Sequence, residues 1–332
     1  LGDVYKRQKK YIAILLAAAM ATLGISACRK ENSNKETKVQ KDSDIKVVTT
    51  IFPEYDWVRQ IAGEEADQMD ITMLLDNGVD LHSYQPTAED IMKVSDCDLF
   101  VYVGGESDAW VDDALKQAKN KDMQVVDLLD VLGNSAKEEE VIEGMEPEEE
   151  EEEPEYDEHV WLSVKNAEVL SKAIADALEK VDPDHKDIYQ ENASAYSEKL
   201  KDLDAKYQEV VDGASQKTLL FGDRFPFRYL VDDYGLSYYA AFVGCSAESE
   251  ASFDTISFLA NKVDELGLKD IMAIENSNQK IAKTIIENTK EKNQKILTLD
   301  SMQSITSDDV KNGTTYLSVM EKNLEVLKEA LQ

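Results

Sequence analysis

From Lys46 onward, the chain alternates short apolar runs with stretches whose apolar residues recur at helical spacing. The apolar runs are typical of strands, and the first four are KVVTTI, DITMLL, DLFVYV and MQVVDL. Four more follow in the second half of the chain, namely KTLLFG, SYYAAF, DIMAIE and KILTLD. Because each run precedes a helical stretch, we expect parallel sheets with right-handed crossovers. The pattern therefore predicts an α/β fold with two doubly wound lobes, each built on a parallel four-stranded sheet.

Two long helical stretches lie between these two groups of strands. Residues 164–181 carry apolar residues at i, i+3 and i+4, which predicts an amphipathic helix. Residues 187–214 are rich in helix formers and contain no glycine before Gly213. This composition predicts a connector helix that is stiffer than a Gly/Ser linker. The expected lobes are therefore an N-terminal one over residues 46–186, with an acidic insertion at 137–158, and a C-terminal one over residues 215–332.

The first 28 residues differ in composition from the rest. Four basic residues precede the apolar stretch YIAILLAAAMATLGISAC, which is the pattern of a secretory signal. Its end, Ile25 to Cys28, resembles a bacterial lipobox, so we expect Cys28 to be lipidated and to anchor the protein outside the cell membrane. A single membrane anchor is the alternative, although the apolar run is at the short limit for crossing a bilayer. Residues 29–45 are polar and are expected to form a flexible tether.

The overall composition limits the possible functions. A hydrophobic fraction of 42% in 332 residues is sufficient for two domains with cores. The formal net charge of -32 argues against nucleic-acid binding, which needs a basic surface, and is compatible with cationic partners. Cys97 and Cys245 are compatible with an extracellular disulfide, or with two small buried apolar side chains.

Several imidazoles and carboxylates follow predicted strands. Ligands of open α/β sheets bind at the carboxyl ends of the strands, so these positions are candidates for a site. A cation held between the lobes requires such groups at one edge of each lobe. Strand ends are polar in any case, which weakens this indication. They are His82 after the second strand, His159 after the fourth, Asp223 after the fifth, Glu275 after the seventh and Asp300 after the eighth. The third histidine, His185, lies in a polar turn and is expected to be exposed.

Six consecutive glutamates, residues 148–153, come shortly before His159. One interpretation is a mobile negative loop at the mouth of the site that raises the local concentration of cations. The other is a solvated, disordered loop without a function. No nucleophile elbow, phosphate loop or His-Glu-x-x-His motif is present in the sequence.

Four segments carry a resemblance to a known family. GVDLHSYQPTAEDI is similar to a Pro-His-x-Tyr-x-Pro segment, and DEHVWLSVKNA to Asp-Pro-His-Val-Trp-Leu-Asp-Pro. DLFVYVGGESDAWVDDAL and ILTLDSMQS also have counterparts. Together they resemble the metal-binding lipoproteins of bacterial ABC importers for zinc and manganese. The resemblance implies a binding protein and not an enzyme, one that is monomeric and passes metal to a permease and its cytoplasmic ATPase.

The resemblance also implies a ligand set. His82 and His159 match the first two ligands, and Asp300 matches the fourth. The third position departs from the family's histidine or glutamate, and Asp223 is the candidate there, with Glu250, Glu248 and Glu275 as further candidates or as groups beside the site. Leu81 and Glu158 replace the prolines that precede the two histidines, which we expect to affect loop stiffness more than ligand chemistry.

Two imidazoles and two carboxylates form a ligand set of intermediate hardness. Imidazole suits Zn²⁺ and carboxylates suit Mn²⁺, and a four-coordinate set with two histidines is an ordinary zinc geometry. We therefore expect Zn²⁺ as the transported ligand, with Mn²⁺ as the alternative. A metal-dependent hydrolase and a surface adhesin active in cell adhesion are the two alternative functions.

Overall fold

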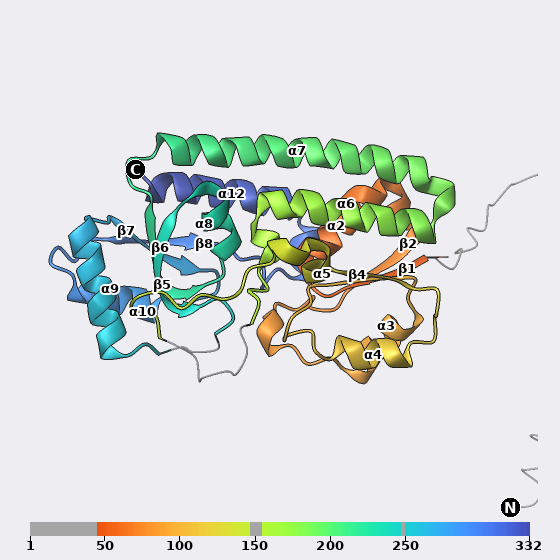
Figure 1. Cartoon of the computed structure of the whole chain (residues 1–332), viewed down its shortest axis with the longest axis horizontal. Helices are drawn as coiled ribbons and strands as arrows, with labels where there is room; N and C mark the ends of the chain where they lie inside the picture. Colours follow the sequence, from red (N-terminus) through yellow and green to blue (C-terminus); the bar gives the residue numbers. More distant parts are fainter. Residues whose placement is uncertain (1–44, 147–154, 247–249) are drawn as a thin grey trace, which may run out of the picture. The chain divides into compact units, whose positions relative to one another are not determined.

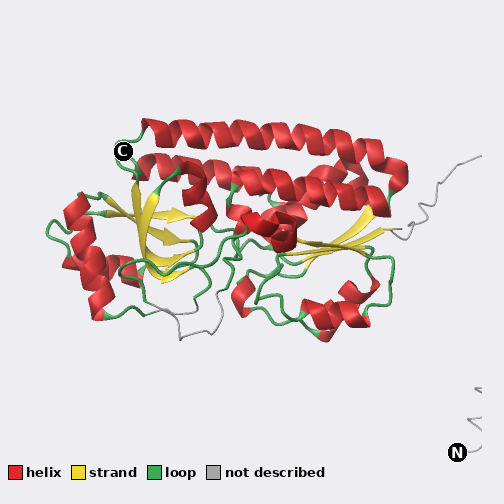
Figure 2. Cartoon of the chain, viewed as in Figure 1, coloured by secondary structure: helices red, strands yellow, loops and turns green. Residues whose placement is uncertain are grey.

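The computed structural model describes residues 45–146, 155–246 and 250–332. It contains two parallel four-stranded sheets with strand orders β2-β1-β3-β4 and β6-β5-β7-β8. Figure 2 shows them as two separate groups of yellow strands with helices around them. The predicted α/β fold with two doubly wound lobes is confirmed. The predicted signal sequence, Cys28 and the tether up to residue 44 lie outside the described residues, whereas Ile45, assigned to the tether, belongs to β1.

The first sheet forms the N-terminal lobe. Its strands are paired in parallel throughout, and their central residues are almost fully buried, as in sheets covered by helices on both faces. The strands are β1 (Ile45–Thr49), β2 (Met69–Met73), β3 (Leu99–Tyr102) and β4 (Gln124–Asp127). The helices are α2 (Phe52–Ala62), α3 (Ala88–Asp96), α4 (Val111–Gln117), α5 (Leu128–Leu132) and α6 (Val164–Val181), with short 3₁₀ turns η1 (Gly63–Gln68), η2 (Leu81–Ser83), η3 (Gly133–Ser135), η4 (Val160–Leu162) and η5 (Pro183–His185).

The second sheet forms the C-terminal lobe. Side-chain oxygens accept the first free amide groups of its helices, as Ser252 does for α9 and Thr315 for α12. Glycines in the left-handed conformation end α8 and α9. The strands are β5 (Thr218–Phe225), β6 (Ser237–Val243), β7 (Asp270–Ile274) and β8 (Lys295–Leu299). The helices are α8 (Arg228–Tyr234), α9 (Phe253–Leu266), α10 (Lys280–Asn288), α11 (Ser307–Lys311) and α12 (Tyr316–Ala330).

The long helix α7 (Lys186–Gly213) joins the two lobes. It contacts α2 and α6 of the first lobe and α8 and α12 of the second, and Figure 1 shows it running beside them. Its buried side chains belong to a hydrophobic core that contains residues of both lobes. Tyr316 of α12 reinforces this connection, since its ring packs on Trp57 and its hydroxyl donates to the carbonyl of Trp161. The lobes are therefore connected by packing as well as by the chain.

The helices of the described residues include none with the length and apolar character needed to cross a bilayer. The carboxyl ends of β2 and β4 in one lobe, and of β6 and β8 in the other, lead into the loops that carry the candidate ligands. Because all strands within each sheet are parallel, these loops gather at one edge of each sheet.

Candidate metal centre

His82 is held by the turn that follows β2. Asp80 begins this turn, and its Oδ1 accepts the amide of His82 at 3.0 Å. The ring Nδ1 of His82 lies 2.9 Å from Ser107 Oγ and 3.3 Å from Glu158 Oε2. A proton on Nδ1 can be donated to Ser107 Oγ, and Nε2 then keeps its lone pair. The turn thus presents an imidazole nitrogen that is suited to binding a metal.

His159 is fully buried and lies just before η4. Oδ1 of Asp157 accepts both the backbone amide and the ring Nδ1 of His159, each at 2.9 Å. A carboxylate on the far ring nitrogen is the usual partner of a metal-binding histidine, because it fixes the orientation of the ring. The next residues, Val160, Trp161 and Leu162, are completely buried and anchor the loop.

The two imidazoles converge on one point. Nε2 of His82 and Nε2 of His159 lie 3.1 Å apart. With both Nδ1 atoms protonated, two lone pairs face each other, so only a proton or a metal ion between them makes the arrangement favourable. Two nitrogens bound to one tetrahedral zinc at the usual Zn–N length are about 3.4 Å apart. The observed separation is close to this value.

Burial controls the charge of the groups around His159. It lowers the pKa of His159 well below its usual value, which keeps the imidazole neutral at physiological pH. Burial also raises the pKa of Asp157 to about 7, so the ionised form that accepts the Nδ1 proton is present above that pH. Burial opposes the ionisation of Glu158, but the contacts of its carboxylate with His82 and Ser107 outweigh this effect and lower its pKa. The centre therefore combines the neutral imidazole of His159 with nearby carboxylates.

Glu158 does more than affect the stiffness of its loop, which corrects the expectation from the sequence. Its side chain is buried, and its Oε1 accepts the amide of Ser107 at 2.8 Å while Oε2 faces the ring of His82. Gly105, with a φ of +79°, makes room for it, since a Cβ there would lie 2.4 Å from Oε1. Glu158 thus links the loop of one histidine to the ring of the other.

Cys245 is the third group at this centre. Its Sγ and the ring nitrogens of His82 and His159 all lie within 4.8 Å of one another, and it forms no disulfide. Gly244 allows the approach, because a Cβ there would lie 3.0 Å from the ring of His159. Cys245 follows β6, so the rule applied to the other strand ends would have selected it. From the sequence alone, Cys245 is expected to be only a disulfide partner or a buried apolar side chain.

Gln303 is a fourth neighbour that the sequence did not indicate. Its side chain is 5% exposed, and its Nε2 lies 3.2 Å from Nε2 of His159. Its Oε1 is buried and has no hydrogen-bond partner among the described residues. An amide carries no charge and is a less common metal ligand than a carboxylate, so a sequence search for ionisable groups does not find it.

Asp223 and Asp300 lie outside this group of three. Among the described residues, His82, His159 and Cys245 alone form a set of three or more potential ligands at such mutual distances. The expectation that Asp223 follows the fifth strand is wrong, because β5 continues to Phe225 and Asp223 lies at a register shift within it. Its Oδ1 accepts the amide of Arg224. Asp300 directly follows β8, as expected, and its Oδ1 accepts the amide of Met302 at 2.8 Å.

The further candidates have other partners. Glu275 follows β7, and its carboxylate accepts the amide and the hydroxyl of Ser301 at 2.7 and 2.6 Å. Burial raises the pKa values of Glu275 and Asp300, and for Glu275 the neighbouring charge of Asp300 adds to the effect. Glu250 is exposed and paired with Lys280 at 2.8 Å, and Glu248 lies outside the described residues. The role of these carboxylates as ligands stays a prediction.

The first part of the acidic insertion, residues 137–146, contacts the C-terminal lobe. Lys137 pairs with Asp232 at 2.8 Å, and the amide of Glu146 donates to the carbonyl of Ala241 at 3.0 Å. The carboxylate of Glu139 accepts the amide of Cys245 at 3.0 Å. This segment therefore connects both lobes next to the centre. The six glutamates themselves lie in 147–154, outside the described residues.

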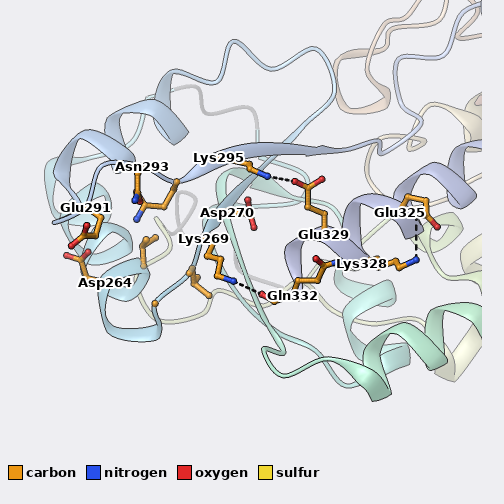
Figure 3. Close-up of a pocket in the computed structure, with 14 residues that line it drawn as sticks. Asp264, Lys269, Asp270, Glu291, Asn293, Lys295, Glu325, Lys328, Glu329 and Gln332 are labelled. Carbon is orange, nitrogen blue, oxygen red and sulfur yellow. Dashed lines mark hydrogen bonds and ion pairs between the residues drawn. The ribbon is translucent and has the colours of Figure 1, made fainter.

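A separate hollow of about 830 Å³ lies near the amino ends of β7 and β8. Figure 3 shows charged side chains around it that pair with one another or with the end of the chain. Lys295 pairs with Glu329 at 2.7 Å, and Lys269 donates to the carbonyl of Gln332 at 3.4 Å. This hollow lies at the amino ends of its strands, whereas the histidines follow the carboxyl ends of theirs. Its lysines have partners, including Glu325 for Lys328, so it is a weaker candidate for a binding site.

Two parallel α/β lobes joined by a long helix, with paired imidazoles between them, define a two-lobed solute-binding protein. The chain belongs to the family described as the zinc-uptake complex component A, periplasmic (ZnuA), which matches residues 47–330. This confirms the resemblance inferred from the four sequence segments.

Individual relatives agree with this assignment. The zinc-binding lipoprotein AdcA of Streptococcus pneumoniae is 34% identical over 319 residues, which cover 95% of this chain and 60% of AdcA. The high-affinity zinc uptake system protein ZnuA of Bacillus subtilis is 31% identical over 330 residues, 97% of this chain and 98% of ZnuA. The Zn(II)-bound ZnuA-like domain of S. pneumoniae AdcA superimposes with a TM-score of 0.68 and 32% identity, covering 86% of this chain and 98% of that domain.

Proposed function

We propose that this protein captures Zn²⁺ outside the cytoplasm and delivers it to an ABC permease driven by a cytoplasmic ATPase. The observation that carries the proposal is the convergence of the Nε2 atoms of His82 and His159 at 3.1 Å, with each Nδ1 already bound to an oxygen. With both Nδ1 atoms protonated, the two Nε2 lone pairs cannot hydrogen-bond to each other, and such a pair is suited to a borderline cation such as zinc. The names of AdcA and ZnuA, which describe zinc binding and zinc uptake, support the choice of metal.

The proposal includes the location of the protein. Lipidation of Cys28 would hold a monomer at the outer face of the cell membrane, with residues 29–45 as the tether. Two acyl chains give stable anchoring where one chain gives marginal binding. The lipoprotein named among the relatives supports this part of the proposal.

The proposed role is binding and not catalysis. A hydrolytic zinc site keeps a position open for water with a base beside it, whereas a transport site encloses its ion between the lobes. His159 is fully buried, which suits enclosure of the ion. The names of AdcA and ZnuA describe zinc binding and uptake and do not favour the adhesin alternative.

The test is metal accumulation in a strain that lacks this protein. We expect the strain to lose zinc accumulation in zinc-poor medium and to regain it with the wild-type gene or the His185→Ala variant. His82→Ala and His159→Ala should not restore it. Normal zinc accumulation in the deletion strain, in the absence of another importer, would contradict the proposal, as would a loss of manganese alone.

A further inference from the structure

We propose that Cys245 binds the transported metal as a thiolate, together with Nε2 of His82 and Nε2 of His159. The inference rests on the proposed function, because the same two imidazoles capture the metal there. It adds a ligand of a different chemical class, one that selects among metals. The proton of the thiol goes to solvent when the sulfur binds.

The sulfur and the two imidazoles need to approach one another only slightly to bind one metal ion. Sγ of Cys245 and one ring nitrogen of each histidine already lie within 4.8 Å of one another. In tetrahedral zinc with ordinary bond lengths, a nitrogen and a sulfur ligand are about 3.6 Å apart. A movement of Cys245 by at most about 1.2 Å would bring the sulfur to this distance. The loop contributes from the C-terminal lobe while both histidines belong to the N-terminal lobe, so the bound metal would join the two.

The surroundings of Cys245 support a role at the centre. Its backbone amide is held by the carboxylate of Glu139, and the preceding Gly244 lets the loop approach the ring of His159. Within the described part of the chain, the sulfur is not joined to another cysteine. It is therefore positioned toward the imidazoles by the backbone and remains a free thiol.

Gln303 provides independent evidence for a ligand at this point. Its Oε1 is buried without a hydrogen-bond partner among the described residues, and its Nε2 lies 3.2 Å from Nε2 of His159. A buried, unpartnered amide oxygen is costly unless something binds it. Rotation of the terminal amide by half a turn exchanges nitrogen and oxygen, and would direct the oxygen to a metal held by the imidazoles. The fourth ligand of the set is then the amide oxygen of Gln303.

A thiolate changes the selectivity that the site would have with carboxylates. Thiolate is a soft ligand that favours zinc, whereas manganese prefers carboxylate, carbonyl and water oxygens. A set of two imidazoles, one thiolate and one amide oxygen therefore discriminates against Mn²⁺ more strongly than two imidazoles with two carboxylates.

The test uses Co²⁺ as a spectroscopic substitute for zinc in the purified full chain. A thiolate bound to Co²⁺ gives a charge-transfer absorption in the near ultraviolet, which imidazole and oxygen ligands do not give. We expect this absorption in the wild type and its loss in Cys245→Ser. The matched control is Cys97→Ser, because the Cys97 thiol is buried in the N-terminal lobe, 3.2 Å from the carbonyl of Val94, and should leave the spectrum unchanged.

Zinc affinity provides the second readout. Cys245→Ser and Cys245→Ala should weaken zinc binding by at least about tenfold, and Cys245→Asp should narrow the preference for zinc over manganese. If the wild-type protein binds Co²⁺ without this absorption, the proposal that Cys245 is a ligand is wrong, while the proposed function is unaffected. Unchanged zinc affinity in Cys245→Ala would do the same. A wild type that binds neither metal would instead contradict both.

Discussion

Arg224 of β5 forms an ion pair with Asp80, the residue that caps the turn carrying His82. The pair crosses from the C-terminal lobe to the N-terminal lobe. One oxygen of Asp80 accepts the amide of His82, and the other binds the guanidinium. The position of one histidine therefore depends on a charged contact with the opposite lobe.

We expect Arg224→Ala to lower the free energy of unfolding at neutral pH by about 1 kcal/mol. Burial raises the pKa of Asp80, but the charge and hydrogen bond of Arg224 outweigh it and hold the pKa below 3.8. Because the folded pKa is depressed, the stabilisation is present above the unfolded pKa and is lost as pH falls through the folded one. Urea unfolding of the wild type and the variant should therefore converge as the pH falls through the lowered pKa of Asp80.

The control for this pair is Arg59→Ala. Arg59 lies 4.0 Å from Asp67, and the two side chains are 40% and 87% exposed, so its removal should cost less stability than that of Arg224. An Arg224→Ala variant as stable as Arg59→Ala at neutral pH would show that the contact with Asp80 contributes nothing.

Asp157→Asn tests the orientation of His159. The amide in place of the carboxylate can present its NH₂ group to Nδ1, which favours the wrong tautomer for metal binding at Nε2. We expect zinc affinity to fall by about 10 to 100-fold with little change in unfolding. Asp182→Asn is the matched control, since Asp182 accepts Nδ1 of His185 at 2.7 Å away from the centre. Equal affinities of the two variants would contradict the role of Asp157.

Gly105→Ala tests the space that Glu158 needs. Both Gly105 and Gly133 have positive φ angles, so alanine at either position should cost about 1 kcal/mol of stability. A Cβ at Gly105 would collide with Glu158 Oε1, whereas at Gly133 no heavy atom lies within 4 Å. Of the two variants, we expect only Gly105→Ala to reduce zinc affinity, because it displaces the carboxylate that faces His82. Isothermal titration of both variants measures the difference, and a similar affinity for both would rule out this role for Glu158.

Replacing the glutamates at 148–153 by glutamine tests the acidic tract. Six fewer negative charges should slow zinc association at low ionic strength, because unscreened charge raises the local concentration of cations. The equilibrium affinity should stay within a few-fold of the wild type. Stopped-flow association at low and high salt measures the effect, and an equal slowing at both salt concentrations would exclude electrostatic attraction as its cause.

The sequence predicted the elements well because their patterns are local. The helix at 164–181 has the bounds of α6, and each predicted strand contains most of an observed one. The extension of β5 through Asp223 was not predictable in this way, because the register shift depends on its pairing with β6. The need for glycine at position 222 is a second such case, since a Cβ there would collide with the backbone of Ala282 in α10. Such constraints come from partners that are distant in sequence.

The candidate centre was predicted only where the residue type is distinctive. His82 and His159 stand out because histidine is rare in this chain and because imidazole binds metals. Cys245 and Gln303 are recognisable only from their distances to His159, which depend on the packing of the two lobes. The buried position of Glu158 against His82 has the same origin.

The most direct test of the central claim is the zinc affinity of three single variants, one for each histidine of the chain. Competition against a chelator of known affinity should give one tightly bound zinc for the wild type and for His185→Ala, since His185 is bonded to Asp182 and not to the other histidines. His82→Ala and His159→Ala should each weaken binding by more than about 100-fold, because each removes one of the two converging nitrogens. Wild-type affinity in His159→Ala would contradict the account, since the buried ring at the centre of the site would then not bind the metal.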